Sequence, residues 1–453
     1  MRIVIEGAGE VGSHLAKMLS QEANEITVID NDSAKLEKLK MTADVVTITG
    51  NPSSISILRE AGVPNADLFI SVNPGSAQDI NIVSALIAKN LGAKKVTARV
   101  NDEEYLTADN KLLFKQMGIE LMFFPEKIAA DEISSMLRHG GSTDSIDFAH
   151  GRLQMAVFKV EDDSPILEMK LAEFTAALST DELQFRVVAI AHEGVTTMPE
   201  ANYKFRFHDL VYIMTTREGM EGVRPVLGKS NVNINKAMIL GGGRIGEMVA
   251  RQLSKDIEDI KIIEIDKNKC LRLSERLNLD NVTIVNGDSR NTDFLAEENI
   301  SDYDAFLALT GHDELNVLSC VVAKKFGVEK TIAEVENIEY IRLAEEMGVD
   351  AVINKKLITA GKIFKFTLSD KARSVHYMGG TSAEVLEYTA APDSKITKGA
   401  LKDINFPRKA VIGGVIRGSN AFIPVGDSVI EAYDRVEVFA LPEEAKEVDR
   451  FFR

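Results

Sequence analysis

Two stretches of this 453-residue chain repeat each other, and the repeat limits the possible fold more than any other feature. Residues 3–12 are IVIEGAGEVG and residues 237–246 are AMILGGGRIG, with the three glycines at the same spacing. NLGAKKVTARV (90–100) returns as KFGVEKTIAEV (325–335). A repeat period of about half the chain predicts a tandem duplication in which each unit carries its own copy of any site.

Strands and helices alternate in the first part of each unit. RIVIEG (2–7) is a short β-branched run that ends at glycine, VGSHLAKMLSQE (11–22) has apolar residues at helical spacing, and EITVID (25–30) follows as a second strand. This alternation predicts a doubly wound α/β domain. We interpret RHGGSTDSID (138–147) as a linker, because it is rich in glycine, serine and aspartate. Short alternating apolar runs beyond it, such as LVYIMTT (210–216), predict a small β-rich domain.

The predicted fold class is therefore α/β, with two doubly wound, Rossmann-like parallel-sheet domains, each followed by a small β-rich α+β domain, in tandem duplication. EGMEGVRPVLGKSNVNINK (218–236) is the expected boundary between the two units. The predicted domains are 1–138 and 234–355 for the two Rossmann-like parts and 140–224 and 368–453 for the two β-rich parts.

The first glycine run stands between a predicted strand and a predicted helix, which is the context of a dinucleotide-binding loop. Gly7 permits a tight turn, Gly9 lets a pyrophosphate approach the backbone, and Gly12 lets helix and strand pack closely. The free N–H groups at the start of the helix favour an anion. Asp30, at the end of the second strand, is expected to bind ribose hydroxyls and to repel a 2′-phosphate, which favours NAD or adenosine nucleotides over NADP. The corresponding second set is Gly241, Gly243, Gly246 and Asp266.

The two predicted sites differ in charge. Glu10 in the first loop stands where Arg244 stands in the second, and Arg99 at the end of the fifth strand matches Glu334. An arginine in the loop can pair bidentately with a terminal phosphate, which a glutamate would repel. We therefore expect the first site to prefer a dinucleotide and the second to accept ADP or ATP as well. The alternative is that both loop side chains point into solvent, as loop charges usually do.

Composition disfavours several classes of partner. The net charge is −16 and the pI is about 5.1, which disfavours binding to nucleic acid or to anionic lipid. No apolar run approaches the ~20 residues that cross a bilayer. A strand expected from Arg2 leaves no room for a cleaved signal peptide. Cys270 and Cys320 are isolated and offer neither metal-ligand spacing nor a disulfide framework. We expect a cytosolic protein that reaches a membrane only through a partner, and no metal site.

Catalytic motifs are missing from the sequence. Of the seven scattered histidines, only His312, which precedes Asp313 and Glu314 near the second predicted crevice, merits a test. There is no G-x-S-x-G, no H-E-x-x-H and no Walker-type lysine after the glycines. We therefore expect a nucleotide-binding regulator without catalytic residues. The alternative is an NAD-dependent oxidoreductase whose β-rich domains cap an unidentified substrate. A redox-sensing repressor is a third hypothesis, which the acidic charge and the lack of a basic recognition helix count against.

Taken together, these motifs resemble the TrkA-type regulators of bacterial Trk and Ktr potassium uptake systems. The resemblance rests on GAGEVG with Asp30, GGGRIG with Asp266, GHDELN (311–316) and the β-rich repeats, and it covers nearly the whole chain. It implies tandem regulator-of-potassium-conductance (RCK) domains, each with a nucleotide-binding N domain and a regulatory C domain. It also implies NAD(H) and adenine nucleotides as ligands, a homo-oligomeric ring, expected to be a tetramer, and an integral-membrane K⁺ transporter as the partner.

The resemblance further implies which residues contact the ligand. NPGSAQDIN (73–81) departs from the Thr-x-x-Asp-Glu-x-Asn pattern of the family, and Pro74 and Gly75 indicate a remodelled loop there. The expected contacts are Gly7, Ala8, Gly9, Glu10, Val11, Gly12, Asp30, Asn51, Asn73 and Arg99 in the first unit, and Gly241, Gly242, Gly243, Arg244, Ile245, Gly246, Asp266, Asp288, Thr310 and Glu334 in the second.

Overall fold

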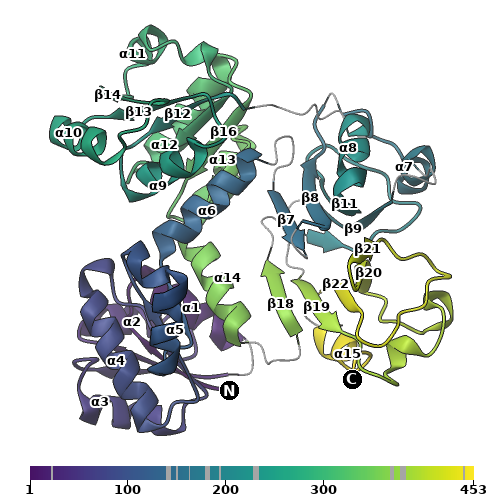
Figure 1. The fold of residues 1–453 in the computed structure, drawn as a ribbon, viewed down its shortest axis with the longest axis horizontal. Coiled ribbons are helices and arrows are strands. Elements are labelled where there is room, and N and C mark those ends of the chain that lie inside the picture. The colour runs from purple at the N-terminus through teal and green to yellow at the C-terminus, as the bar shows by residue number, and fades with distance from the viewer. Residues whose placement is uncertain are drawn as a thin grey trace. The chain divides into compact units, whose positions relative to one another are not determined.

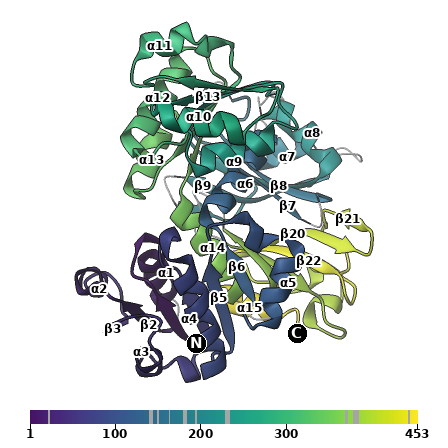
Figure 2. The same ribbon diagram turned by 60° about the vertical axis from the view of Figure 1, so that its left-hand side comes forward.

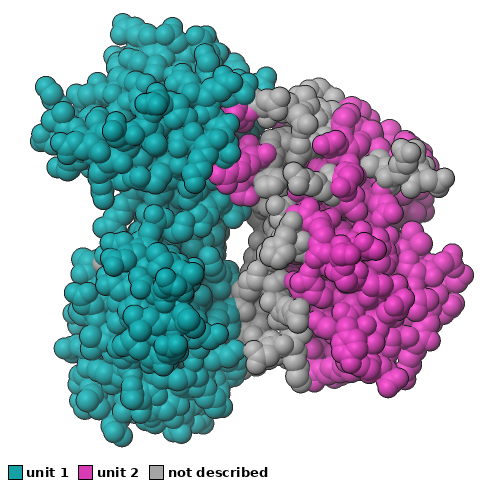
Figure 3. All heavy atoms as spheres, in the orientation of Figure 1, with its two compact units in different colours: residues 1–134, 235–367 teal, residues 135–234, 368–453 magenta. Residues whose placement is uncertain are grey.

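A computed structural model describes most of the chain, namely residues 1–21, 24–138, 144–148, 151–162, 164–178, 184–192, 195–227, 234–367, 372–377, 384–441 and 444–453. The chain folds into two compact units, which Figure 3 shows in different colours. Unit 1 consists of residues 1–134 and 235–367, and unit 2 of residues 135–234 and 368–453. Each unit therefore combines one part of the first half of the chain with the equivalent part of the second half.

The first half of unit 1 is a six-stranded parallel sheet in the order β3-β2-β1-β4-β5-β6, with helices in the crossover connections (Figure 1). Its elements are β1 (Arg2–Glu6), α1 (Glu10–Gln21), β2 (Glu25–Asp30), α2 (Ser33–Lys40), β3 (Val46–Thr49), α3 (Ile55–Glu60), β4 (Leu68–Ser71), α4 (Gln78–Leu91), β5 (Lys95–Arg99), α5 (Ala108–Gln116), β6 (Leu121–Phe123) and α6 (Pro125–Arg138).

The second half of unit 1 repeats this topology, in the order β14-β13-β12-β15-β16-β17. Its elements are β12 (Lys236–Leu240), α9 (Arg244–Leu253), β13 (Asp259–Glu264), α10 (Lys267–Arg276), β14 (Val282–Asn286), α11 (Thr292–Glu297), β15 (Ala305–Ala308), α12 (Asp313–Lys325), β16 (Lys330–Glu334), α13 (Glu339–Glu346), β17 (Ala351–Ile353) and α14 (Lys355–Thr367).

The central strands of both sheets are buried on both faces, as their sequences predict. Every residue of β4 and of β15 is buried, and so are the last four residues of β1 and of β12. Apolar strands of this kind suit a parallel sheet covered by helices on both sides. In each sheet the strand order reverses between the first and the fourth strand, so a crevice is expected at their carboxyl ends.

The last helix of each half packs on the other half. Helix α14 lies against α1, and Figures 1 and 2 show it beside the first parallel sheet. Gln252 of α9 donates a hydrogen bond to Asp131 of α6, with 2.8 Å between Nε2 and Oδ1. The two halves of unit 1 are thus joined by an exchange of helices. Because the predicted second Rossmann-like domain stops at residue 355, the sequence prediction left α14 unassigned.

Unit 2 contains two antiparallel sheets of the same topology, β10-β9-β11-β8-β7 and β21-β20-β22-β19-β18. The first comprises β7 (Asp144–Phe148), β8 (Leu153–Lys159), α7 (Leu171–Leu178), β9 (Phe185–His192), β10 (Val195–Thr197), β11 (Leu210–Thr216) and α8 (Arg217–Val226). The second comprises β18 (Ala372–Tyr377), β19 (Glu384–Thr389), β20 (Ala410–Arg417), β21 (Asn420–Phe422), β22 (Arg435–Ala440) and α15 (Ala445–Asp449).

The two antiparallel sheets share one hydrophobic core. Leu153 and Met214 from the first sheet cluster with Val385 and Phe439 from the second, and all four side chains are buried. A polar contact accompanies this core, because Arg186 of β9 donates to the carbonyl oxygen of Pro424 at 2.5 Å. The two β-rich parts therefore share one core within unit 2.

A buried aspartate repeats at equivalent places in the two antiparallel sheets. Asp209 accepts a hydrogen bond from the backbone N–H of Arg206 at 2.8 Å and contacts His192 Nδ1 at 2.7 Å. Asp434 accepts from the N–H of Glu431 at 2.8 Å and from the guanidinium of Arg417. Each aspartate therefore satisfies a backbone N–H in the turn before the last strand of its sheet, β11 or β22, and the two halves of the chain share this role.

The predicted fold class is confirmed, and two local predictions are corrected. Residues 144–147 belong to strand β7 and not to a linker, while residues 139–143 of that segment lie outside the described part. Residues 218–226 of the predicted boundary at 218–236 belong to helix α8, and residues 228–233 lie outside the described part. The four predicted domain boundaries remain a prediction. Within the part of the chain that the structure describes, no helix is both long enough and apolar enough to cross a membrane.

We expect Phe439→Ala to lower the free energy of unfolding by about 3–5 kcal/mol, because it leaves a cavity in a core that both antiparallel sheets share. Chemical denaturation followed by circular dichroism measures this change. Val195→Ala is the matched control, because Val195 is exposed on β10 and its truncation should change stability by less than about 0.5 kcal/mol. Equal effects of the two substitutions would contradict the shared core.

Candidate nucleotide-binding sites

The first glycine loop joins β1 to α1 in a conformation that only glycines allow. Gly7 has φ +103°, and a Cβ there would lie 3.0 Å from Oδ1 of Asn73. A Cβ on Gly12 would lie 1.8 Å from the carbonyl oxygen of Gly7, so helix and strand could not approach as they do. A Cβ on Gly9 would meet no atom within 4 Å, so this position faces open space. The steric roles predicted for Gly7 and Gly12 are those observed, and the approach of a pyrophosphate at Gly9 stays a prediction.

The second glycine loop, between β12 and α9, has the same geometry. Gly241 has φ +102°, and a Cβ on Gly246 would lie 2.2 Å from the carbonyl oxygen of Gly241. Gly243 faces open space, like Gly9. Val11 and Ile245, which follow the open glycines, point their side chains into the core, since each is only 5% exposed. Only their backbone can therefore face a ligand.

An acidic side chain at the end of the second strand holds each loop in place. Asp30, which is 6% exposed, accepts a hydrogen bond from the backbone N–H of Ala8 at 2.6 Å. In the second half Glu264, 4% exposed, accepts from the N–H of Gly242 at 3.0 Å. Glu264, which the sequence analysis missed, is therefore the structural equivalent of Asp30.

The predicted equivalence of Asp266 with Asp30 is corrected. Asp266 caps helix α10, because its Oδ1 accepts hydrogen bonds from the backbone N–H groups of Asn268 and Lys269. Asp32 caps α2 in the same way. Asp266 therefore corresponds to Asp32, and its carboxylate is engaged by its own helix.

Two buried asparagines, also missed from the sequence, hold together the strand ends that border each crevice. Asn81 of α4 accepts from the backbone N–H of Asn73 at 3.1 Å and donates to the carbonyl oxygen of Arg99 at 3.1 Å. Asn316 of α12 accepts from the N–H of Thr310 at 3.0 Å and donates to the carbonyl oxygen of Glu334 at 2.8 Å. Each asparagine thus fixes the ends of the fourth and fifth strands relative to each other.

A pocket of about 300 Å³ lies at the carboxyl ends of the second sheet. Among the residues predicted to bind a nucleotide, Gly241, Gly243, Asp288 and Thr310 line it, whereas Gly242, Arg244, Ile245, Gly246, Asp266 and Glu334 are not among its lining residues. The other lining residues are Leu240, Ile263, Glu264, Ile265, Lys269, Gly287, Ser289, Arg290, Leu309, Gly311, His312 and Leu315. His312, the histidine singled out in the sequence, therefore borders this pocket.

The rim of this pocket carries an exposed ion pair. Arg290 binds the carboxylate of Asp288 through Nη2 at 2.6 Å and through Nε at 2.9 Å. These hydrogen bonds lower the pKa of Asp288 to about 2. Asn51, at the equivalent position of the first half, accepts instead from the backbone N–H of Ser53 at 3.0 Å. The two crevices therefore differ in charge at this rim as well as in their loops.

The charged loop residue of the first half reaches the second half of unit 1. Glu10 forms an ion pair with Lys356 at the start of α14, with 3.1 Å between Oε2 and Nζ. Arg99 pairs with Glu126 of α6 at 3.2 Å, and both side chains are largely buried. Burial lowers the pKa of Arg99, and the charge of Arg244 from the other half lowers it further. The two loop residues, Glu10 and Arg244, are nevertheless both exposed, as the alternative interpretation expects, whereas Arg99 is not.

Glu334, the counterpart of Arg99, is buried and faces a lysine. Its carboxylate lies 3.7 Å from Nζ of Lys355, and Lys355 also pairs with Glu336 at 3.1 Å. Burial raises the pKa of Glu334 to about 7, against the opposing effect of Lys355. Arg99 and Glu334 thus occupy equivalent places with opposite charges, as the sequence predicts.

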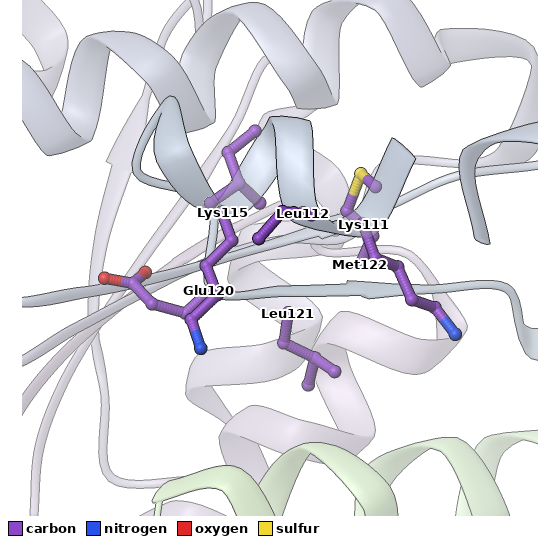
Figure 4. A pocket seen from close by; sticks show the side chains of 7 residues that line it. Lys111, Leu112, Lys115, Glu120, Leu121 and Met122 are labelled. Atoms are coloured by element: carbon purple, nitrogen blue, oxygen red, sulfur yellow. The ribbon is translucent and has the colours of Figure 1, made fainter. Parts of the chain in front are cut away.

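Among the described residues, no three histidine, cysteine, aspartate or glutamate side chains gather so that they could hold a metal ion. A separate pocket of about 270 Å³ lies between α5 and β6, away from the glycine loops. Figure 4 shows its lining side chains, which include Leu112, Leu121 and Met122 beside Lys111 and Lys115.

The chain is similar to Trk potassium uptake proteins along its whole length. The TrkA-N domain matches it at residues 3–125 and again at residues 237–355. It is 31% identical over 467 residues to the Trk system potassium uptake protein TrkA homolog 1 of Methanosarcina mazei, and 32% identical over 454 residues to the TrkA homolog of Archaeoglobus fulgidus, with 100% of each chain covered in both pairs. It is 30% identical to TrkA of Halomonas elongata, covering 100% of this chain and 99% of that one.

Solved structures support the fold. The GsuK RCK domain has a TM-score of 0.62 at 15% identity, with 100% of this chain and 94% of that chain covered. The GsuK channel bound to NAD has a TM-score of 0.61 at 15% identity, with 100% and 78% covered. At this level of identity the similarity establishes the fold alone.

We expect Gly12→Ala to lower the free energy of unfolding by about 1–3 kcal/mol, because the new Cβ would overlap the carbonyl oxygen of Gly7. Gly9→Ala adds the same methyl group in open space, and its effect should stay within about 0.5 kcal/mol. Urea denaturation of the two variants measures the difference. A stable Gly12→Ala variant would mean that helix and strand are not held as closely as described.

Proposed function

The chain belongs to the TrkA family of potassium uptake proteins, and from this membership we propose that it is the peripheral regulatory subunit of a Trk-type K⁺ transporter. The observation that carries the proposal is the pair of glycine loops, each fixed by a buried carboxylate at the end of the second strand. The family membership agrees with a non-catalytic regulator and counts against the oxidoreductase and repressor alternatives.

We propose NAD(H) as a ligand, with ADP or ATP as alternatives at the second site. The open faces of Gly9 and Gly243 leave room for a pyrophosphate beside the backbone N–H groups of α1 and α9. Asp30 and Glu264 stand where ribose hydroxyls are bound in folds of this topology. The similarly folded GsuK channel, solved with NAD bound, is an example of this fold holding a dinucleotide.

Regulation would follow from differential binding. A ligand that binds one shape of unit 1 more tightly than another shifts the equilibrium by that difference in affinity and no more. Moving an equilibrium from mostly closed to mostly open takes about 5.5 kcal/mol, which several sites in one assembly supply more readily than one site. The ion pair between Glu10 and Lys356 gives a ligand at the first loop a direct route to helix α14.

We propose a cytoplasmic location at the inner face of the membrane, held there by an integral-membrane K⁺ transporter. The described part of the chain has no helix that could span a membrane, and the net charge of −16 disfavours direct adhesion to anionic lipid. A protein partner with a basic face would complement this charge.

A homo-oligomer, expected to be a tetrameric ring, is also part of the proposal. Both halves of unit 1 expose the same two apolar positions on the fifth helix. Leu113 of α5 and Met117 directly after it are 50% and 45% exposed. Leu343 of α13 and Met347 directly after it are 48% and 38% exposed. Exposed apolar faces of this kind mark interaction surfaces, and a face that recurs in both halves suits a second copy of this chain.

Calorimetric titration with NADH, NAD, ADP and ATP tests the two sites. We expect Gly9→Asp to weaken binding at the first site at least tenfold, or about 1.4 kcal/mol, and Gly243→Asp to do the same at the second site. A carboxylate at these positions would repel the phosphates without displacing any described atom.

Gly399→Asp is the matched control for both variants, because a Cβ on Gly399 in unit 2 also meets no atom within 4 Å. It should bind as the unmodified chain does. Normal binding by Gly9→Asp and Gly243→Asp, or no binding by the unmodified chain, would contradict the two sites. Unchanged potassium uptake after deletion of the coding gene would contradict the transport function.

Leu113→Glu combined with Leu343→Glu should reduce the mass of the assembly, because both substitutions charge the proposed apolar contact. Sedimentation velocity measures the mass. Met41→Glu is the control, since Met41 is 84% exposed after α2 and should leave the assembly intact. An unmodified chain that sediments as a monomer would overturn this part of the proposal.

A further inference from the structure

The last residue of β1 is a buried glutamate directly before the first glycine loop. Glu6 is 0% exposed. Its Oε1 accepts hydrogen bonds from Nδ2 of Asn73 at 2.5 Å and from Oγ of Ser84 at 3.1 Å. Its Oε2 is buried and has no hydrogen-bond partner among the described residues. A carboxylate so poorly solvated is costly unless it is neutral.

Hydrogen bonds hold the polar side chains around Glu6 to one another. The backbone N–H of Asn73 donates to Oδ1 of Asn81 at 3.1 Å, and the hydroxyl of Ser71 donates to the same oxygen at 2.8 Å. Ser71 is also the register partner of Glu6 in the β1–β4 pair. Oε2 of Glu6 stays buried without a hydrogen-bond partner among the described residues, and protonation of the carboxyl removes the cost of burying a charge there.

The second half of unit 1 builds the same strand ends without these two polar residues. In the paired positions of β12 and β15 it has Leu240 and Ala308, where the first half has Glu6 and Ser71. Asn316 occupies the place of Asn81 in both position and hydrogen bonding. The fold therefore does not require a carboxyl group at this place, and its presence is a property of the first crevice.

Glu6 is coupled to the first loop through Asn73. The side chain of Asn73 donates to Glu6, and its backbone nitrogen lies 3.1 Å from the position that a Cβ on Gly7 would take. An ionised Glu6 would place a negative charge one residue before the loop that is proposed to hold a pyrophosphate.

Neutral groups surround the carboxyl. Ser71 of β4, Asn73 after β4 and Ser84 of α4 are the polar groups that face it, and burial outweighs their hydrogen bonds and raises the pKa of Glu6 to about 8. The charged side chains at this end of the neighbouring elements, none of which contributes to that shift, are Glu10, Asp30, Asp79 and Arg99. Of these, Glu10, Asp30 and Arg99 are engaged with Lys356, Ala8 and Glu126.

We propose that Glu6 is a proton-binding site that couples nucleotide binding at the first crevice to pH. The protonated form keeps Asn73 and the glycine loop in the arrangement described, and loss of the proton weakens the binding of an anionic nucleotide. The inference rests on the proposed function, because it takes the first crevice to be a nucleotide site.

The binding test isolates the first site by using the Gly243→Asp background. In this background the dissociation constant for NADH should rise about fivefold between about pH 7 and pH 9, as follows from a pKa of Glu6 of about 8 in the free protein and one unit higher in the complex. The double substitution Glu6→Leu with Ser71→Ala installs the pair found in the second half, and its dissociation constant should not change over this range. Equal pH profiles with and without Glu6 would overturn the proposal.

Infrared spectroscopy tests the proton without any nucleotide. The difference spectrum between the unmodified chain and Glu6→Leu/Ser71→Ala should contain the carbonyl stretch of a protonated carboxyl group at about pH 7, and this band should disappear as the pH rises through about 8. The subtraction cancels the contribution of Glu334, whose pKa is raised to about 7. If the double variant folds poorly, Glu6→Gln takes its place in the subtraction. A difference spectrum without this band would overturn the proton site. A band with the expected behaviour but no NADH binding would instead refute the proposed nucleotide function.

Discussion

Each crevice depends on one hydrogen bond, from the glycine loop to the carboxylate at the end of the second strand. The N–H of Ala8 donates to Asp30, and that of Gly242 donates to Glu264. This bond ties the start of the first helix to the neighbouring strand, so it fixes the helix N-terminus relative to the sheet edge where open α/β sheets bind ligands. The other oxygen of each carboxylate accepts from the backbone N–H two residues further along the chain, that of Asp32 or of Asp266. A carboxylate has about four lone-pair positions, so these two hydrogen bonds do not exhaust it. The same group can thus shape the loop and still bind a ribose hydroxyl.

The repeat and the glycine spacing were sufficient to predict both parallel sheets and both loops, because close helix–strand packing leaves few other residues possible at those positions. The same spacing could also have identified Glu264, which stands 18 residues after Gly246 (264 − 246), just as Asp30 stands 18 after Gly12 (30 − 12). Asp266 matches Asp30 in residue type, whereas Glu264 matches it in its distance from the glycine loop. The structure shows that an aspartate two positions later serves as the helix cap, a short-range role that spacing from the loop does not reveal.

The sequence could not predict the contacts between distant parts of the chain. Periodicity indicates which face of a helix is buried but not which body buries it, so α14 could not be assigned to α1. The pairing of Glu10 with Lys356 joins residues that are 346 positions apart (356 − 10). Glu6 was hidden for a different reason, because a carboxyl at the end of a buried strand is rare and pattern reasoning expects an apolar side chain there.

The duplicated sites share a backbone and differ in their electrostatics. Both loops present the same open glycine and the same helix N-terminus, so both can attract an anion equally well through the backbone. The first site adds Glu10 and the buried Glu6, while the second has Arg244 and Leu240 at those positions. Side-chain charge must therefore decide which anion each crevice prefers. Because α14 packs on α1 while belonging to the second half, a change at either crevice acts on the same body. Two sites of unlike charge on one body can bias a single equilibrium with two different ligands, which identical sites could not do.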